Sequence, residues 1–246
     1  MEPTFNAILV PKGAEYSAVS RGVQKVVATP PLAPLPQVFA IPVGPQPVTQ
    51  YLQQWLQTWK TRTQCPPQIL MMGLCGSLTA KHRVGEVVSY RGCYDGSQFS
   101  SVPMSLTPRS VMEWDDQGVG ASPVMGVTCD RIIHTAAQKH QLATTYQADV
   151  VDMEGFAALS FFQVRQIPMA ILRVVSDDAH HDLPDLTSVL TSTGELQPLP
   201  LAINLLRQPF GAMRLIQGSL RGLRVLSEVT TRLFCEPSEP SSNSRG

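Results

Sequence analysis

Three short, mainly apolar segments constrain the fold of this chain most strongly. They are NAILV at 6–10, QILMM at 68–72 and MAILRVV at 169–175, and stretches with helical spacing of apolar residues lie between them. A strand that is apolar on both faces must be covered on both sides, which is typical of parallel sheets packed between helices. The pattern therefore predicts an α/β protein with a doubly covered, largely parallel sheet.

The remaining elements follow from shorter patterns. Further strands are expected at 38–43, 84–90, 123–128 and 150–151. Helices are expected at about 14–23, 154–165 and within 201–234, and another should begin at Asp130 as N-cap and run to about Leu142. One helical face should pack in the core, because its apolar residues recur at helical spacing: Val48, Tyr51, Leu52, Trp55, Leu56 and Trp59.

Length and composition predict one domain at 1–234 and a disordered polar tail at 235–246. The formal net charge is zero and only 15% of the 246 residues are charged, so we expect neither nucleic acid nor an anionic membrane as a partner. The five scattered cysteines form no C-x-x-C pair, which favours free thiols in a reducing compartment. With no signal-peptide pattern and no apolar span of about 20 residues, the sequence predicts a cytoplasmic protein.

Four segments with unusual chemistry coincide with the ends of predicted elements: PKGAEY (11–16), GLCGSL (73–78), VVDMEG (150–155) and SDDAHHD (176–182). In parallel sheets, ligands bind beyond the carboxyl ends of the strands. We therefore expect these segments to surround a single site.

Together, GLCGSL, VGEVV, VVDMEGFAA and LRVVSDDA form an ordered set that resembles the purine/uridine phosphorylase superfamily over about residues 6–178. Within that superfamily, the chain looks closest to the 5′-methylthioadenosine/S-adenosylhomocysteine nucleosidases. The resemblance implies a single-domain, three-layer α/β/α fold with a mixed, largely parallel central sheet. It also implies a homodimer, a small nucleoside as substrate, and no metal or organic cofactor.

The resemblance assigns catalytic roles to Glu154, Asp177 and Glu15. Glu154 would hold the ribose 2′- and 3′-hydroxyls and favour positive charge on the sugar, and Asp177 would protonate N7 of the leaving purine. Glu15 would bind the attacking water and the 3′-hydroxyl. Since a free aspartic acid has a pKa near 4, burial and a like-charged neighbour such as Asp178 must raise that of Asp177.

Substrate-binding roles follow from the same resemblance. Met153 would pack on the sugar, Ser176 would orient Asp177, and Arg173 would support the site or form a structural ion pair. Cys75 and Gly76 would lie along the base, and Ile132, or Arg131 beside it, stands where the family has a base-stacking aromatic residue. The sequence also departs from the family at Leu74, where many nucleosidases have serine.

The implied function is hydrolysis of a 5′-substituted adenosine to release adenine. A phosphate-dependent phosphorylase and a nucleoside-binding protein without catalysis are the alternatives. GLCGS also resembles a nucleophile elbow with Cys75 at its centre, but Ser77 replaces the last glycine, and Asp178 and His180 are too close in sequence for a triad. The sequence leaves the 5′ substituent open.

Overall fold

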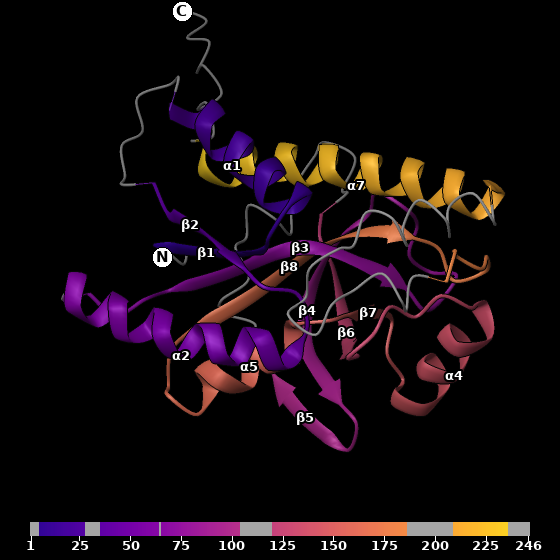
Figure 1. Cartoon of the computed structure of the whole chain (residues 1–246), viewed down its shortest axis with the longest axis horizontal. Coiled ribbons are helices and arrows are strands. Elements are labelled where there is room, and N and C mark those ends of the chain that lie inside the picture. Colours follow the sequence, from indigo (N-terminus) through magenta and orange to yellow (C-terminus); the bar gives the residue numbers. More distant parts are fainter. Residues whose placement is uncertain (1–4, 28–34, 64, 104–119, 186–208, 236–246) are drawn as a thin grey trace, which may run out of the picture.

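The computed structural model describes residues 5–27, 35–63, 65–103, 120–185 and 209–235 of the protein (Figure 1). Its strands are β1 (Ala7–Pro11), β2 (Gln37–Ile41), β3 (Ile69–Ser77), β4 (Val87–Asp95), β5 (Gln98–Ser101), β6 (Ser122–Thr128), β7 (Val150–Asp152) and β8 (Met169–Asp177). Its helices are α1 (Ala14–Val27), α2 (Pro45–Arg62), α4 (Ala136–Tyr146), α5 (Gly155–Gln163) and α7 (Pro209–Phe234).

All eight strands belong to one mixed sheet with the order β2-β1-β3-β7-β6-β4-β5, and β8 pairs with both β3 and β4. Parallel pairs join β1 to β2 and β3, β3 to β8, and β6 to β4 and β7. Antiparallel pairs join β3 to β7, β4 to β5 and β4 to β8. The pairs β3–β7–β6–β4–β8–β3 close a ring, so Gly76 on β3 lies opposite both Val151 on β7 and Asp177 on β8.

Helices cover the sheet on both faces, which confirms the predicted three-layer α/β/α class. In Figure 1, α1 and α7 pack together on one face, α2 and α5 lie on the other, and α4 lies at one end of the sheet. The core under α2 and α5 contains Trp55, Trp59 and Phe162. The rings of Trp55 and Phe162 pack edge to face, with 6.1 Å between their centroids. The helical face predicted between Val48 and Trp59 is buried in that core, with Tyr51 only partly buried.

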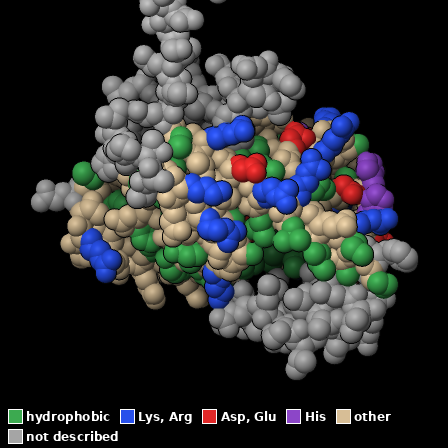
Figure 2. Space-filling view, turned by 90° about the horizontal axis from the view of Figure 1, so that it is seen from above, with side chains coloured by type: hydrophobic (Ala, Val, Ile, Leu, Met, Phe, Trp, Pro, Cys, Tyr) green, Lys and Arg blue, Asp and Glu red, His purple; other side chains and the backbone are tan. Residues whose placement is uncertain are grey.

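The outer surface of α1 and α7 is polar and mainly basic. Figure 2 shows Lys and Arg side chains spread over this face with few acidic ones among them. Met213, Ile216 and Leu220 of α7 are also exposed there, whereas the opposite side of the helix packs on α1 and β8. No helix among the described residues is both long and apolar enough to span a bilayer.

Three details of the sequence prediction are wrong. The helix expected from Asp130 begins at Ala136, because Thr135 is the N-cap and its side chain accepts a hydrogen bond from the Gln138 amide. The strand expected at 68–72 extends through most of the GLCGSL segment and ends at Ser77. Strand β5 was not expected, although Gly96–Ser97 is a typical two-residue hairpin turn between β4 and β5. The start of the expected 201–234 helical region and nearly all of the expected polar tail lie outside the described residues.

Candidate active site

A cavity of about 380 Å³ lies at the carboxyl ends of β1, β3, β7 and β8. It is surrounded by the four segments that the sequence singled out, and Leu215, Ser219 and Leu223 of α7 close one side. Eight of the nine predicted site residues line it: Glu15, Cys75, Gly76, Ile132, Met153, Glu154, Ser176 and Asp177. The expectation of one site at these strand ends therefore agrees with the structure, and the role of each residue stays a prediction.

The ninth residue, Arg173, lies beneath the cavity and does not line it. Its guanidinium is fully buried, and Nη2 lies 2.8 Å from Asp152 Oδ2 and 3.4 Å from Glu154 Oε2. Breaking such a buried pair would leave an uncompensated charge, so the three side chains depend on one another. Arg173 thus forms the structural ion pair that the sequence analysis named as one of its two roles, and it holds together the carboxylates of the VVDMEG segment.

The end of β7 and the start of α5 place Asp152 and Glu154. Asp152 Oδ1 accepts hydrogen bonds from Thr128 Oγ1 at 2.6 Å and from the Gly155 amide at 3.1 Å. The second bond satisfies the first amide of α5. Glu154 is the N-cap residue of α5, and its Oε1 accepts a hydrogen bond from the Gly44 amide at 3.2 Å. Burial raises the pKa of Glu154, and Arg173 opposes that shift.

Glu15 enters the cavity from the first turn of α1. Its Oε2 accepts a hydrogen bond from the Leu74 amide at 2.7 Å. Any side chain at Gly73 would collide with Glu15 and Arg173. Burial raises the pKa of Glu15 to about 7, against the opposing effect of Arg173 and the Leu74 amide. A carboxyl that titrates near neutrality is suited to taking a proton from water.

Asp177 lines the same cavity and lies beside Gly76, where any side chain would collide with its carboxyl oxygens. Burial raises the pKa of this carboxyl, while Lys139 and a hydrogen bond from Ser176 oppose the shift and Asp178 adds to it. Ser176 Oγ lies 2.9 Å from Asp177 Oδ1 and 3.2 Å from the Cys75 carbonyl oxygen. Burial is therefore the main source of the raised pKa, and the like-charged neighbour contributes less than the sequence argument assumed.

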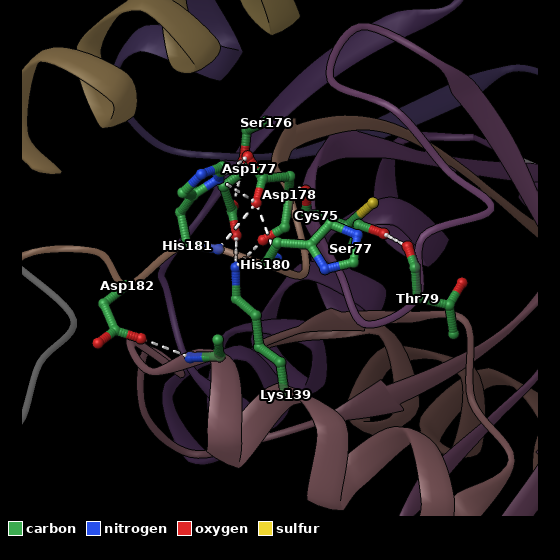
Figure 3. A network of polar contacts seen from close by, with 11 residues as sticks. Cys75, Ser77, Thr79, Lys139, Ser176, Asp177, Asp178, His180, His181 and Asp182 are labelled. Atoms are coloured by element: carbon green, nitrogen blue, oxygen red, sulfur yellow. Dashed lines mark hydrogen bonds and ion pairs between the residues drawn. The ribbon is translucent and has the colours of Figure 1, made fainter.

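Lys139 is the residue that sequence reasoning missed. It lies on α4, its side chain is fully buried, and Nζ lies 2.5 Å from Asp177 Oδ2 (Figure 3). In the sequence, Lys139 stands in the polar stretch QKHQ, which resembles any solvated helix surface. Only the packing of α4 against the end of β8 distinguishes it.

A sequence model of the phosphorylase superfamily matches residues 49–197. The chain belongs to the phosphorylase superfamily. The matched part contains Cys75, Glu154 and Asp177, whereas Glu15 precedes it. A comparison with curated proteins gives no sequence match.

Solved structures with a similar fold include nucleosidases of this superfamily. The Helicobacter pylori 5′-methylthioadenosine/S-adenosylhomocysteine nucleosidase is 12% identical, with 95% of this chain and 99% of that chain covered and a TM-score of 0.65. The Helicobacter pylori futalosine hydrolase is 13% identical, with 92% and 96% covered and a TM-score of 0.64. A Borrelia burgdorferi protein assigned as such a nucleosidase, with adenine bound, is 12% identical, with 92% and 98% covered and a TM-score of 0.67. At these identities the likeness establishes the shared fold.

A second, larger cavity of about 780 Å³ adjoins the first. Val43, Arg131, Ile133 and Met153 line both cavities. Most of the other lining residues of the larger cavity are polar, and they come from the start of α2, the β4–β5 turn and α4. The first cavity therefore continues past Met153 into the second, larger one.

Proposed function

We propose that the protein is a nucleosidase that cleaves the N-glycosidic bond of a 5′-substituted adenosine with water and releases adenine. The observation that carries the proposal is the convergence of Glu15, Glu154 and Asp177 on one cavity. Glu154 pairs with Arg173, and Asp177 lies beside Gly76. Three carboxyls around one cavity suit a substrate with sugar hydroxyls to bind and a base to protonate.

In this reaction Glu154 accepts hydrogen bonds from the ribose hydroxyls. The Gly44 amide and Arg173 hold its carboxylate in place, so it is oriented before positive charge develops at C1′. Asp177 protonates the purine at N7, which makes the base a neutral leaving group. Leu74, Ile132 and Met153 supply apolar contacts around the substrate, with Ile132 in place of an aromatic ring.

Water is favoured over phosphate by the charges around the nucleophile's position. Asp152, Glu154 and Glu15 gather near the guanidinium of Arg173, which already forms ion pairs with the first two. A phosphate dianion would need additional cations there, whereas a water molecule needs none. Met71, which stands where uridine phosphorylases have an arginine, is buried and apolar. Arg131 lines the cavity and is the observation that keeps the phosphorylase as the second candidate.

Cys75 is not the nucleophile of this proposal. The residue is buried, and burial raises the pKa of its thiol well above the ordinary value. Because the thiolate is the reactive form of cysteine, a buried thiol with a raised pKa disfavours a cysteine hydrolase.

The adjoining cavity supports a substituent at C5′ larger than a hydroxyl. Its polar lining includes Asp130, Gln138 and Gln141, which suits a substituent with hydrogen-bonding groups. We further propose that the enzyme acts as a homodimer in the cytoplasm, where its five free cysteines stay reduced. Sedimentation analysis would test the dimer.

The proposal is tested by incubating the protein with methylthioadenosine, S-adenosylhomocysteine, 5′-deoxyadenosine and inosine and identifying the free base. We expect adenine from at least one 5′-substituted adenosine and little hypoxanthine from inosine. Tight binding of a nucleoside without release of any base would instead identify a non-catalytic binding protein.

A further inference from the structure

A buried lysine is unusual because an ammonium group loses most of its hydration inside a protein. Lys139 Nζ has two oxygen partners, Asp177 Oδ2 and the Asp178 carbonyl oxygen, each at 2.5 Å (Figure 3). Asp177 lines the cavity, whereas Lys139 does not. The carboxyl group therefore lies between the ammonium group and the space proposed for the base.

The start of α4 fixes this arrangement. The Ala136 amide donates to Asp182 Oδ1 at 2.7 Å, and the Leu183 amide donates to the His134 carbonyl oxygen at 2.7 Å. These bonds tie the helix to the segment that follows β8. Lys139 is therefore held against Asp177 by the backbone as well as by its own charge.

We propose that Lys139 supplies the proton that Asp177 delivers to the leaving base. Because Lys139 acts through Asp177, it is a positioning residue and not a catalytic one. The inference rests on the proposed nucleosidase function, and it extends that function by making the lysine and the aspartate one proton-donating unit.

The C1′–N9 bond breaks and its electron pair goes to the base. A proton leaves the Lys139 ammonium, forms an O–H bond on Asp177 and passes to N7, which leaves Lys139 as a neutral amine. Water forms the new bond to C1′ and loses a proton to Glu15. Exchange with solvent returns that proton to Lys139 before the next turnover.

Other charged groups surround the pair and enter its titration. Asp178 Oδ2 lies 2.9 Å from His181 Nδ1, and Asp178 Oδ1 accepts hydrogen bonds from the backbone amides of His180 and His181. The remaining titratable residues, drawn in Figure 3 or present on α4, are Cys75, Asp182, His140 and Tyr146. None of these is an additional ion-pair partner of Lys139 among the described contacts.

Two roles for Lys139 predict opposite shifts in the pH profile. If Lys139 only lowers the pKa of Asp177 by its charge, its removal should move the alkaline limit of kcat to higher pH. If Lys139 supplies the proton, the wild type should keep its activity at alkaline pH values at which a variant that relies on Asp177 alone has lost it. Its removal should then move the alkaline limit to lower pH.

The experiment compares kcat from pH 6 to pH 10 for the wild type, Lys139→Met and Lys60→Met, with the best substrate of the adenosine panel. Lys60 is an exposed lysine on α2 and provides the same chemical change away from the site. Between pH 7.5 and 9 we expect a change of less than about twofold for the wild type and Lys60→Met, and a loss of about tenfold or more for Lys139→Met.

If the alkaline limit of kcat rises in Lys139→Met, or does not move, Lys139 does not supply the proton. The proposed nucleosidase function is unaffected by that result. If Lys139→Met does not fold, the wild-type profile still decides, because a loss of kcat that is complete below about pH 8 contradicts the role. A wild-type protein that releases no base from any substrate contradicts the proposed function and the Lys139 role together.

Discussion

At the scale of single residues, Glu15 connects the site to the stability of the whole protein. Its pKa rises from 4.5 to about 7 on folding because the carboxyl is buried, so the folded state retains the proton that the unfolded chain releases. For an acid with a raised pKa, the free energy of unfolding falls as pH rises through this window, here from about 4.5 to 7.

Glu15→Gln should therefore flatten the dependence of stability on pH. Glutamine can still accept the Leu74 amide but has no proton to lose. Between pH 5 and pH 8 we expect the variant to lose about 1–3 kcal/mol less unfolding free energy than the wild type, measured by urea denaturation. Glu228→Gln, an exposed carboxylate on α7, is the matched control and should follow the wild type.

Asp177→Asn should lower kcat by about 10²- to 10⁴-fold, because asparagine keeps the shape of the side chain but cannot donate an acidic proton. Binding of an adenosine analogue, measured by calorimetry, should change much less. A variant with near-normal kcat would show that another group protonates the base.

Glu154→Gln should weaken both ribose recognition and the chemical step. Glutamine removes the anion that pairs with Arg173 and that stabilises positive charge at C1′. The ratio of kcat/KM for a substrate with a 2′-hydroxyl to that for its 2′-deoxy analogue should fall in the variant. An unchanged ratio would mean that Glu154 does not contact the sugar.

At the scale of elements, the start of α2 depends on Gly44. This N-cap residue has φ 97° and ψ 154°, a backbone conformation that is almost restricted to glycine, and its amide donates to Glu154. Gly44→Ala should destabilise the protein by about 1–3 kcal/mol and lower kcat, since the alanine has room but the backbone is strained.

Gly96→Ala is a suitable control for this substitution. Gly96, in the β4–β5 turn, has φ 54° and also has room for a methyl group, but it makes no hydrogen bond to a site carboxylate. We expect a smaller loss of stability, measured by thermal unfolding, and little change in kcat with 5′-deoxyadenosine, which has no 5′ substituent to reach the larger cavity that Gly96 lines. Equal losses of activity in the two variants would contradict the positioning of Glu154 by Gly44.

Sequence patterns predicted the elements that are long or strongly apolar. The buried strands β1, β3 and β8 and the core face of α2 follow directly from hydrophobic periodicity. The start of α4 could not be placed because Asp130 and Thr135 are both good N-caps, and only the packing after β8 selects the second. The short strand β5 is exposed except for Ser100, so no alternating apolar pattern identifies it without its partner β4.

At the scale of the whole molecule, the closed ring of strands brings distant segments into one site. Gly76 lies opposite both Val151 and Asp177, so the motif after β7 and the motif at the end of β8 meet across β3. Strand ends in the sequence were enough to predict that Glu15, Glu154 and Asp177 converge. The partners that tune them, Lys139 and Gly44, come from tertiary contacts across 38 and 110 residues of sequence, which no local pattern shows.

We predict that the protein is a hydrolase. Three carboxyls surround the proposed substrate position, and their negative charge would repel a phosphate dianion there. The most direct measurement is identification of the sugar product by phosphorus NMR and chromatography, with and without inorganic phosphate. We predict free sugar and adenine at equal rates in both buffers. A sugar 1-phosphate, or a rate that saturates with phosphate concentration, would contradict the hydrolase and identify a phosphorylase.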